Sequence, residues 1–256
     1  MLKRDGLLGA IERRLARRVR RRALRMVNSR PLVSFTFDDV PASACETGRT
    51  ILEHHGIRGT YFVSGGLSIE ARGVGGLFRA SHLAELHAAG HEIGSHGYGH
   101  QPYQALARDA VDLDMRTNDD YLRDVIGVDF RAVSFSFPFG STGVRSKEIV
   151  ASRFAAARGV QAGVNRGEID TLLLLGTPLY EQLMTTATVD RLLDEAWRHA
   201  GWLIFYTHEV EATPSRVGCT STSFAKVVET VIRRGFQVLP VKDALAIASG
   251  EQHSPA

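Results

Sequence analysis

Runs of apolar and β-branched residues alternate with amphipathic stretches along the chain after Pro31. Short runs bounded by Gly, Pro or polar residues are typical of buried strands, whereas apolar positions three or four residues apart are typical of helices. The pattern predicts strands at 32–37, 60–63, 91–95, 132–137, 155–160, 171–175, 202–206 and 236–239. It predicts helices near 43–55, 81–89, 104–126, 143–152, 188–200, 222–234 and 241–248.

Seven or eight βα units without an internal linker predict an α/β fold, a distorted or incomplete (β/α)7-8 barrel in a single domain. The 256 residues, 44% of them apolar, are enough for one such core. We expect residues 1–30 to form a helix and linker, 31–250 the barrel, and 251–256 a tail. Cys45 and Cys219 belong to no CxxC pair, so we expect neither a disulfide framework nor a structural zinc site.

Residues 1–27 predict a basic amphipathic helix. Its apolar stripe is Leu8, Ile11, Leu15, Val19, Ala23 and Met26, and arginines occupy the opposite side. The apolar run at the start is too short for a secretory signal, and no stretch is long enough to span a bilayer. We therefore expect a cytoplasmic protein, held peripherally on the inner membrane.

The charge of the chain is divided unevenly. Residues 1–27 contain ten basic and two acidic residues, a net charge of +8, whereas 28–256 contain 21 and 26, a net charge of −5. The basic helix could bind an anionic membrane surface, or it could close the bottom of the barrel with its arginines in solvent. Beyond residue 27 no basic cluster interleaved with aromatics indicates nucleic-acid binding. The sequence does not indicate an oligomeric state.

Two adjacent carboxylates, Asp38 and Asp39, end the first predicted strand. Burying an unpaired carboxylate is costly, so the strand should stop where the acids begin. In α/β folds the carboxyl ends of strands are where functional sites are built. A lone Asp-Asp pair could equally be a helix cap and a solvated acid, so the other strand ends decide between these interpretations.

His96 and His100 follow the third predicted strand, four residues apart. With one carboxylate from a neighbouring strand, two imidazoles form a three-ligand site that leaves a position open for water. This donor set suits Zn²⁺, with Co²⁺ as the alternative, better than Mg²⁺. Two surface histidines on a loop would show the same spacing.

Further polar and aromatic groups end two later strands. Pro138-Phe139-Gly140 closes the strand at 132–137, and Tyr206-Thr207-His208 closes the strand at 202–206. Because parallel strands present their carboxyl ends at one mouth, we expect these groups to converge with the acids and imidazoles. At that rim His208 is a candidate general acid.

These motifs together resemble a known family. The order TFDD, HxxxH, FPFG and an aliphatic strand ending in His, between Thr36 and His208, is similar to the NodB-homology polysaccharide deacetylases, carbohydrate esterase family 4. The resemblance implies a distorted barrel of seven or eight strands and a divalent metal. It also implies removal of acetyl groups from N-acetylglucosamine units.

The resemblance also implies a role for each matching residue. Asp38 would be the catalytic base, and Asp39, His96 and His100 would hold the metal. His208 would protonate the departing amine. Phe139 would offer a backbone N–H to the oxyanion, and Pro138 and Tyr206 would line the substrate pocket, with Tyr206 at the acetyl methyl group.

The sequence departs from the family pattern in three places, which indicates a divergent branch. Gly97 and Gln101 stand where Ser or Thr and Pro usually follow the two histidines. Ser136 stands where the family has an arginine that pairs with the catalytic base. The Asp and Trp that support the acid histidine are not recognisable. We expect Arg166 to take the place of the missing arginine by reaching Asp38.

The leading functional hypothesis is a metal-dependent N-deacetylase in which a metal-activated water attacks the acetamide. Its substrate would be a bacterial exopolysaccharide containing N-acetylglucosamine, or the lipid-linked precursor of one. A hydrolase of a small cyclic amide or ureide is a second hypothesis, which a closed pocket would favour over an open groove. A carbohydrate- or membrane-binding module without catalysis is a third.

Overall fold

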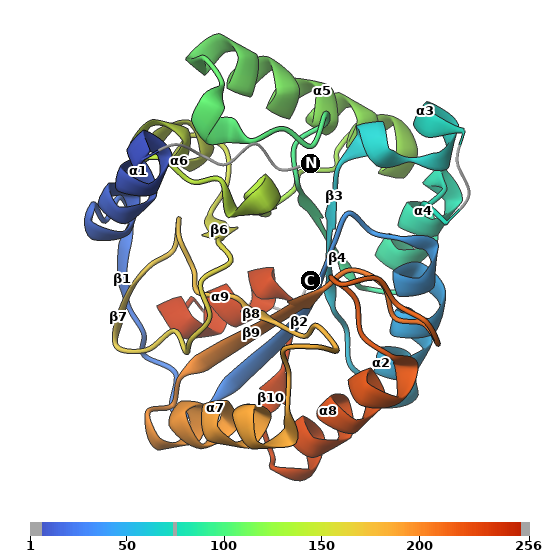
Figure 1. Ribbon diagram of the computed structural model, residues 1–256, viewed down its shortest axis with the longest axis vertical. Helices are drawn as coiled ribbons and strands as arrows, with labels where there is room; N and C mark the ends of the chain where they lie inside the picture. The colour runs from blue at the N-terminus through green and yellow to red at the C-terminus, as the bar shows by residue number, and fades with distance from the viewer. Residues whose placement is uncertain (1–6, 74–75, 252–256) are drawn as a thin grey trace.

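The computed structural model describes residues 7–73 and 76–251. Its centre is a curved sheet of parallel strands in the order β6-β5-β4-β3-β2-β9-β8, with β10 also paired to β2 (Figure 1). The strands are β2 (Leu32–Asp38), β3 (Thr60–Val63), β4 (Glu92–Ser95), β5 (Ser134–Ser136), β6 (Ala156–Arg158), β8 (Thr177–Pro178), β9 (Trp202–Thr207) and β10 (Gln237–Val238). The two edge strands, β6 and β8, do not pair with each other in the described residues. The chain before β8 makes one isolated bridge to β6, between Leu174 and Arg158, and the barrel is therefore incomplete there. The incomplete barrel that the sequence predicts is confirmed.

Helices surround this sheet (Figure 1). They are α1 (Leu7–Arg18), α2 (Arg49–His54), α3 (Ile69–Arg72), α4 (Ala80–Ala88), α5 (Arg108–Ile126), α6 (Val144–Ala151), α7 (Thr186–Arg198), α8 (Ser221–Arg233) and α9 (Val241–Ser249). Short turns of π- or 3-10-helix are η1 (Ala44–Gly48), η2 (Gly65–Leu67), η3 (Tyr103–Ala105) and η4 (Pro138–Gly140). Within the described ranges no helix combines the length and the apolar character that crossing a bilayer requires.

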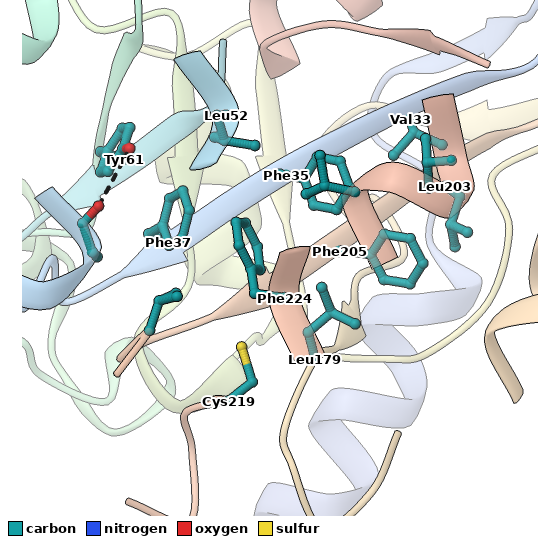
Figure 2. Close-up of a cluster of buried hydrophobic side chains, with 14 of the residues drawn as sticks. Val33, Phe35, Phe37, Leu52, Tyr61, Leu179, Leu203, Phe205, Cys219 and Phe224 are labelled. Atoms are coloured by element: carbon teal, nitrogen blue, oxygen red, sulfur yellow. Dashed lines mark hydrogen bonds between the residues drawn. The ribbon is translucent and has the colours of Figure 1, made fainter. Parts of the chain in front are cut away.

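Strand β2 divides its side chains between two cores, because successive residues of a strand point to opposite faces. Val33, Phe35 and Phe37 point outward into a layer of apolar side chains under the helices (Figure 2). There Phe35 stacks on Phe205 with ring centroids 5.7 Å apart, and Phe37 stacks on Tyr61 at 4.7 Å. The alternate side chains of β2, of which Asp38 is the last, therefore point into the interior of the barrel.

Helix α9 closes the barrel at the amino ends of the strands. The N–H of Val241 donates to Thr60 Oγ1 at 2.9 Å, and the N–H of Lys242 donates to Glu92 Oε2 at 2.8 Å. Thr60 and Glu92 are the first residues of β3 and β4. The N-terminal helix therefore does not close the bottom of the barrel, because α9 fills that place, but it does pack on the barrel, through Lys147 of α6.

The N-terminal segment is helical only to Arg18, which corrects the helix predicted over 1–27. Residues 23–25 form β1 (Ala23–Arg25), antiparallel to β7 (Glu168–Asp170). Asp170 accepts hydrogen bonds from the backbone N–H groups of Arg21 and Arg22, both at 3.2 Å, so these groups are satisfied outside a helix. Residues 1–6 and the predicted tail from 252 onward lie outside the described residues.

Residues 171–175, predicted as a strand, form a turn with a single bridge at Leu174. Asp170 Oδ1 accepts the N–H of Leu172 at 3.1 Å, which bends the chain directly after β7. Leu172 and Leu174 are buried where the barrel is open. This apolar run thus belongs to a buried turn. Hydrophobic periodicity alone does not distinguish a buried turn from a buried strand.

Candidate active site

Three side chains of the types that ligate metals converge at the carboxyl ends of β2 and β4. Asp39 directly follows β2, and His96 directly follows β4. Asp39 Oδ1 lies 3.5 Å from His96 Nε2 and 3.1 Å from His100 Nε2. The three ligand atoms lie within 4.8 Å of one another, so one ion could contact all of them. The structure therefore brings together the residues predicted as metal ligands.

The surroundings of this cluster suit a cation. Asp39 Oδ1 is buried and has no hydrogen-bond partner among the described residues, an arrangement that is costly unless a ligand satisfies it. His96 Nδ1 lies 2.7 Å from the Ser136 carbonyl, which accepts only from an N–H, so Nε2 is the nitrogen directed at Asp39. Burial, followed by the neighbouring His96, lowers the pKa of His100 to about 4, which keeps that ring neutral. Two imidazoles and a carboxylate form a donor set that fits zinc or cobalt.

The backbone at this rim is strained. Asp39, His100 and Phe139 have φ values of 60°, 49° and 58°, in the left-handed region that favours glycine. Each such residue costs about 1–3 kcal/mol and persists only where its surroundings hold it. The fold therefore holds the backbone that presents these groups in a conformation that an isolated loop would avoid.

The loop that carries His100 is held by α5. Asp114 accepts hydrogen bonds from the backbone N–H groups of Tyr98 and Gly99 at 3.0 and 2.8 Å, and from the Tyr103 hydroxyl at 2.8 Å. Gly97 has a φ of 69°, and a Cβ there would lie 2.4 Å from Tyr103 Oη and 2.5 Å from Asp114 Oδ2. The departure from Ser or Thr at this position thus has a physical reason, since a side chain would displace the groups that hold the loop.

Asp38 forms a buried ion pair with Arg158. Arg158 Nη2 contacts both carboxylate oxygens of Asp38 and donates to Ser136 Oγ at 2.7 Å. Ser136 and Arg158 are direct neighbours across β5 and β6. Burial by itself would raise the pKa of Asp38, but Arg158, with His96 and His208, holds that pKa below its usual value. Asp38 is thus an ionised proton acceptor.

Arg166, predicted as the partner of Asp38, lies elsewhere. Its Nε is 3.4 Å from Glu195 Oε1, and about half of its side chain is exposed. The expected contact is therefore wrong, and Arg158 makes it instead. Arg158 is the only charged residue of the short strand β6. This position in a buried strand is the feature of the sequence that could have identified it as the partner of Asp38. A guanidinium in a buried strand needs a carboxylate partner.

His208 directly follows β9 and lies near the carboxylate oxygen of Asp39 that His96 and His100 do not approach. Its Nε2 is 3.7 Å from Asp39 Oδ2, and its Nδ1 is 3.1 Å from the carbonyl of Val217. That carbonyl can accept only from an N–H, so Nε2 is the nitrogen directed at the cluster. The ring centroid lies 5.9 Å from that of Tyr180, a neighbour that the motif comparison missed. A backbone carbonyl and a tyrosine thus contact this histidine where the family has Asp and Trp.

The remaining predicted residues border the same cluster. The ring of Tyr206 lies 4.4 Å from the guanidinium carbon of Arg158, and its edge meets Tyr180. The ring of Phe139 lies 4.4 Å from that of His100, and this side chain is 54% exposed. Pro138, directly before Phe139, is buried. The structure thus brings together every predicted site residue except Arg166.

Solved structures share this fold at low sequence identity. The Xyl-CE4 domain of a multidomain xylanase from the hindgut metagenome of Trinervitermes trinervoides is 16% identical, with a TM-score of 0.54, and 84% of this chain and 89% of that one are covered. The peptidoglycan deacetylase PdaC of Bacillus subtilis is 14% identical, with a TM-score of 0.56 and coverage of 86% and 92%. A CE4 family pseudoenzyme of Bacillus anthracis is 15% identical, with a TM-score of 0.56 and coverage of 88% and 68%. These likenesses establish the fold, and the pseudoenzyme shows that the fold alone does not guarantee activity.

Comparison with curated proteins gives no match. Residues 26–154, half of the chain, match the family model described as polysaccharide deacetylase. This match spans β2 to α6 and includes Asp38, Asp39, His96, His100 and Phe139. The chain therefore belongs to the polysaccharide deacetylase family of hydrolases, carbohydrate esterase family 4.

Proposed function

We propose that this protein is a metal-dependent N-deacetylase of N-acetylglucosamine units in a bacterial exopolysaccharide or its lipid-linked precursor. One observation supports this most directly. A buried, unpartnered Asp39 oxygen faces two imidazole nitrogens, with the ionised Asp38 and His208 beside them. The exposed Phe139 at the rim favours an extended glycan over a small cyclic amide, which would need an enclosed pocket.

Asp39, His96 and His100 would hold the metal, with zinc preferred and cobalt as the alternative. When bound, such an ion lowers the pKa of water toward neutrality and polarises a carbonyl oxygen. The Ser136 carbonyl fixes the ring of His96, so the ligand nitrogen does not have to reorient on binding.

Asp38 would take the proton from the attacking water. A carboxylate is a poor base when its pKa is very low, but a buried one without a counter-charge would be protonated and could not act at all. Arg158 resolves this conflict by keeping Asp38 ionised and fixing the orientation of the carboxylate. The carboxylate of Asp38 would thus be held ionised and in a fixed position, ready to accept a proton.

His208 would supply the proton that the departing amine requires, since an amide anion is a poor leaving group. Its Nδ1–H donates to the Val217 carbonyl, which directs Nε2 toward the reacting nitrogen. The backbone N–H of Phe139 would donate to the oxyanion, a contribution worth about 10²–10³ in rate. Pro138 and Tyr206 would border the acetyl methyl group.

Residues 1–27 would place the enzyme on the cytoplasmic face of the inner membrane. Arg14 and Arg18 of α1 are exposed, and each basic residue near an anionic surface contributes about 1 kcal/mol. Cosedimentation with vesicles should then be strong for anionic lipids and weak for neutral ones. Equal binding to both would contradict this part of the proposal.

The central experiment combines metal analysis with turnover. Purified protein should contain about one zinc or cobalt per chain and release acetate from an N-acetylglucosamine tetramer, and chelation should abolish release until metal is restored. Asp39→Ala should lose both metal and turnover, whereas Asp38→Asn should keep metal but lose about 10²–10⁴ in rate. Full turnover by the chelated protein would rule the proposal out.

A further inference from the structure

His208 begins the loop that joins β9 to α8 (Figure 1). Its imidazole Nδ1 lies 3.1 Å from the carbonyl oxygen of Val217, nine residues further along that loop. The backbone N–H of His208 donates to the same oxygen at 3.2 Å. One peptide carbonyl thus contacts both the ring and the backbone of this histidine. The position of that carbonyl therefore decides where the ring directs Nε2.

The peptide group between Val217 and Gly218 is fixed by a tight turn. Its N–H, which belongs to Gly218, donates to the carbonyl of Ser215 at 3.3 Å. The N–H of Val217 donates to the hydroxyl oxygen of Ser215, also at 3.3 Å. Short polar side chains stabilise turns by such hydrogen bonds to the backbone that follows them. Ser215 thus holds the peptide groups on both sides of Val217.

The Ser215 hydroxyl is in turn oriented by Glu209. Ser215 Oγ donates to Glu209 Oε2 at 2.9 Å, so its lone pairs are left for the N–H of Val217. A Cβ at Gly218 would lie 2.5 Å from the same carboxylate oxygen, which shows that Glu209 lies directly against the turn. The carbonyl of Glu209 also accepts the N–H of Cys219 at 3.0 Å. The two ends of the loop are therefore tied together.

These hydrogen bonds form in a loop that gains little from apolar packing. Residues 211–213 and 215–217 are exposed, and Val217 itself is 37% exposed. A segment with few buried apolar contacts opens easily unless polar contacts hold it. The contacts of Ser215 and Glu209 are therefore the ones that define the shape of this turn.

We infer that Ser215 and Glu209 are positioning residues for His208. This inference rests on the proposed function for the role of His208 as general acid. A proton donor must lie within hydrogen-bond reach of the leaving atom, and a small misplacement costs much of the rate. Glu209 orients the Ser215 hydroxyl, that hydroxyl holds the turn, and the carbonyl of the turn holds Nδ1–H. A turn of the backbone thus stands where the family pattern has an Asp side chain.

Two substrates with different leaving groups separate positioning of the acid from a general loss of structure. The amine of an N-acetylglucosamine tetramer needs a proton to depart, whereas the aryl oxide of para-nitrophenyl acetate departs as a stable anion. Ser215→Ala should lower kcat for the tetramer about tenfold with little change in KM, and should keep kcat for the aryl ester within about twofold. Ser215→Thr keeps the hydroxyl and should recover most of the loss. Equal losses on both substrates, or no loss on either, would overturn the inference.

Glu209 and Glu211 provide matched carboxylates of the same loop. Glu211 is exposed, whereas Glu209 is half-buried against Gly218. Glu209→Ala should lower kcat for the tetramer about three- to tenfold, and Glu209→Gln should retain more of it, because an amide oxygen can still accept from Ser215. Glu211→Ala should leave kcat unchanged. Equal losses in Glu209→Ala and Glu211→Ala would indicate a general effect of charge and would contradict the positioning role.

Nitrogen NMR of the zinc-loaded protein reports the tautomer of His208 independently of turnover. In the parent the neutral ring should carry its proton at Nδ1, and Ser215→Ala should introduce the form protonated at Nε2. Acetate release by the parent, with tautomer and rate both unchanged in Ser215→Ala, would preserve the function and refute the inference. A tautomer that depends on Ser215, without acetate release by the parent, would preserve the positioning of His208 and refute the function.

Discussion

Arg158 is the residue on which the charge balance of the candidate site depends. Its guanidinium satisfies both oxygens of the buried Asp38, and its neighbour Ser136 stands where the family has its own arginine. Ser136 and Arg158 face each other across two strands, so a guanidinium from either position points into the same interior. Arg158 on the adjacent strand β6 therefore supplies the guanidinium that Ser136 lacks.

Arg158→Ala should lower kcat/KM for an N-acetylglucosamine oligomer by about 10²-fold, because Asp38 loses both its counter-charge and its orientation. The exchange Ser136→Arg with Arg158→Ser should recover part of this loss, since it restores a guanidinium to the same interior layer. Arg166→Ala is the control and should leave kcat/KM unchanged. A double variant no better than Arg158→Ala would argue against compensation between the strands.

At the level of elements, the loop between β4 and α5 depends on one carboxylate. Asp114 holds two backbone N–H groups and one hydroxyl of that loop, which carries His100 at a strained φ. Without those three hydrogen bonds the strained conformation has less support. Metal affinity should therefore depend on a residue that does not touch the metal.

Asp114→Ala should weaken zinc affinity about 10- to 100-fold, the usual effect of removing a group that supports a ligand. Competition with a chromophoric chelator measures this directly. Asp124→Ala removes an exposed acid from the same helix and should change nothing. Unchanged affinity in Asp114→Ala would show that the loop keeps its shape without this carboxylate.

Helix α1 is attached to the barrel by a buried lysine of α6. Lys147 is 1% exposed, and its ammonium donates to the carbonyls of Ala16 and Val19 at 2.8 and 2.6 Å and pairs with Asp170. The last carbonyls of a helix need such donors, and a cation at that end also suits the helix dipole.

Lys147→Met should destabilise the protein by about 3–5 kcal/mol, because it leaves Asp170 and two carbonyls without their donor. Trypsin should then cleave first between Arg17 and Arg25, before the barrel is attacked. Lys226→Met, an exposed position on α8, should stay within about 0.5 kcal/mol of the parent in urea unfolding. Global unfolding without early cleavage near α1 would contradict an anchoring role.

At the level of the whole molecule, the free energy of unfolding should decrease at acidic pH because of His91. Its Nδ1 accepts the N–H of Gly59 at 3.0 Å, and its Nε2 lies 3.3 Å from Glu53. Burial lowers the pKa of His91 from 6.5 to about 4, and this effect exceeds the opposing hydrogen bond and charge of Glu53. Between these two pH values the unfolded chain binds a proton that the folded chain excludes.

The contribution of His91 to stability is complete above pH 6.5 and should be lost as the pH falls toward 4, by up to about 3 kcal/mol. His91→Asn keeps an acceptor for the Gly59 N–H but cannot be protonated. Urea unfolding from pH 7 to 4 should show a smaller slope for this variant than for the parent. Parallel curves would exclude His91 as the source of acid sensitivity.

The sequence by itself determined the convergence of Asp38, Asp39, His96, His100, Phe139 and His208. Each follows an apolar run of strand character, and parallel strands place such ends at one mouth whatever the lengths of the helices between them. The motifs and the βα alternation therefore sufficed to predict the incomplete barrel. The apolar run at 171–175 was the exception, because a buried turn and a buried strand show the same pattern.

Only the tertiary structure decided which arginine meets Asp38, where the N-terminal helix ends, and how α1 is attached to the barrel. These outcomes depend on lateral register and on contacts between distant segments, such as Ser136 with Arg158 or Lys147 with Ala16. Periodicity along a chain reports which face of an element is buried, but not which residue lies beside it on the next strand. That neighbour is set by packing of the whole barrel.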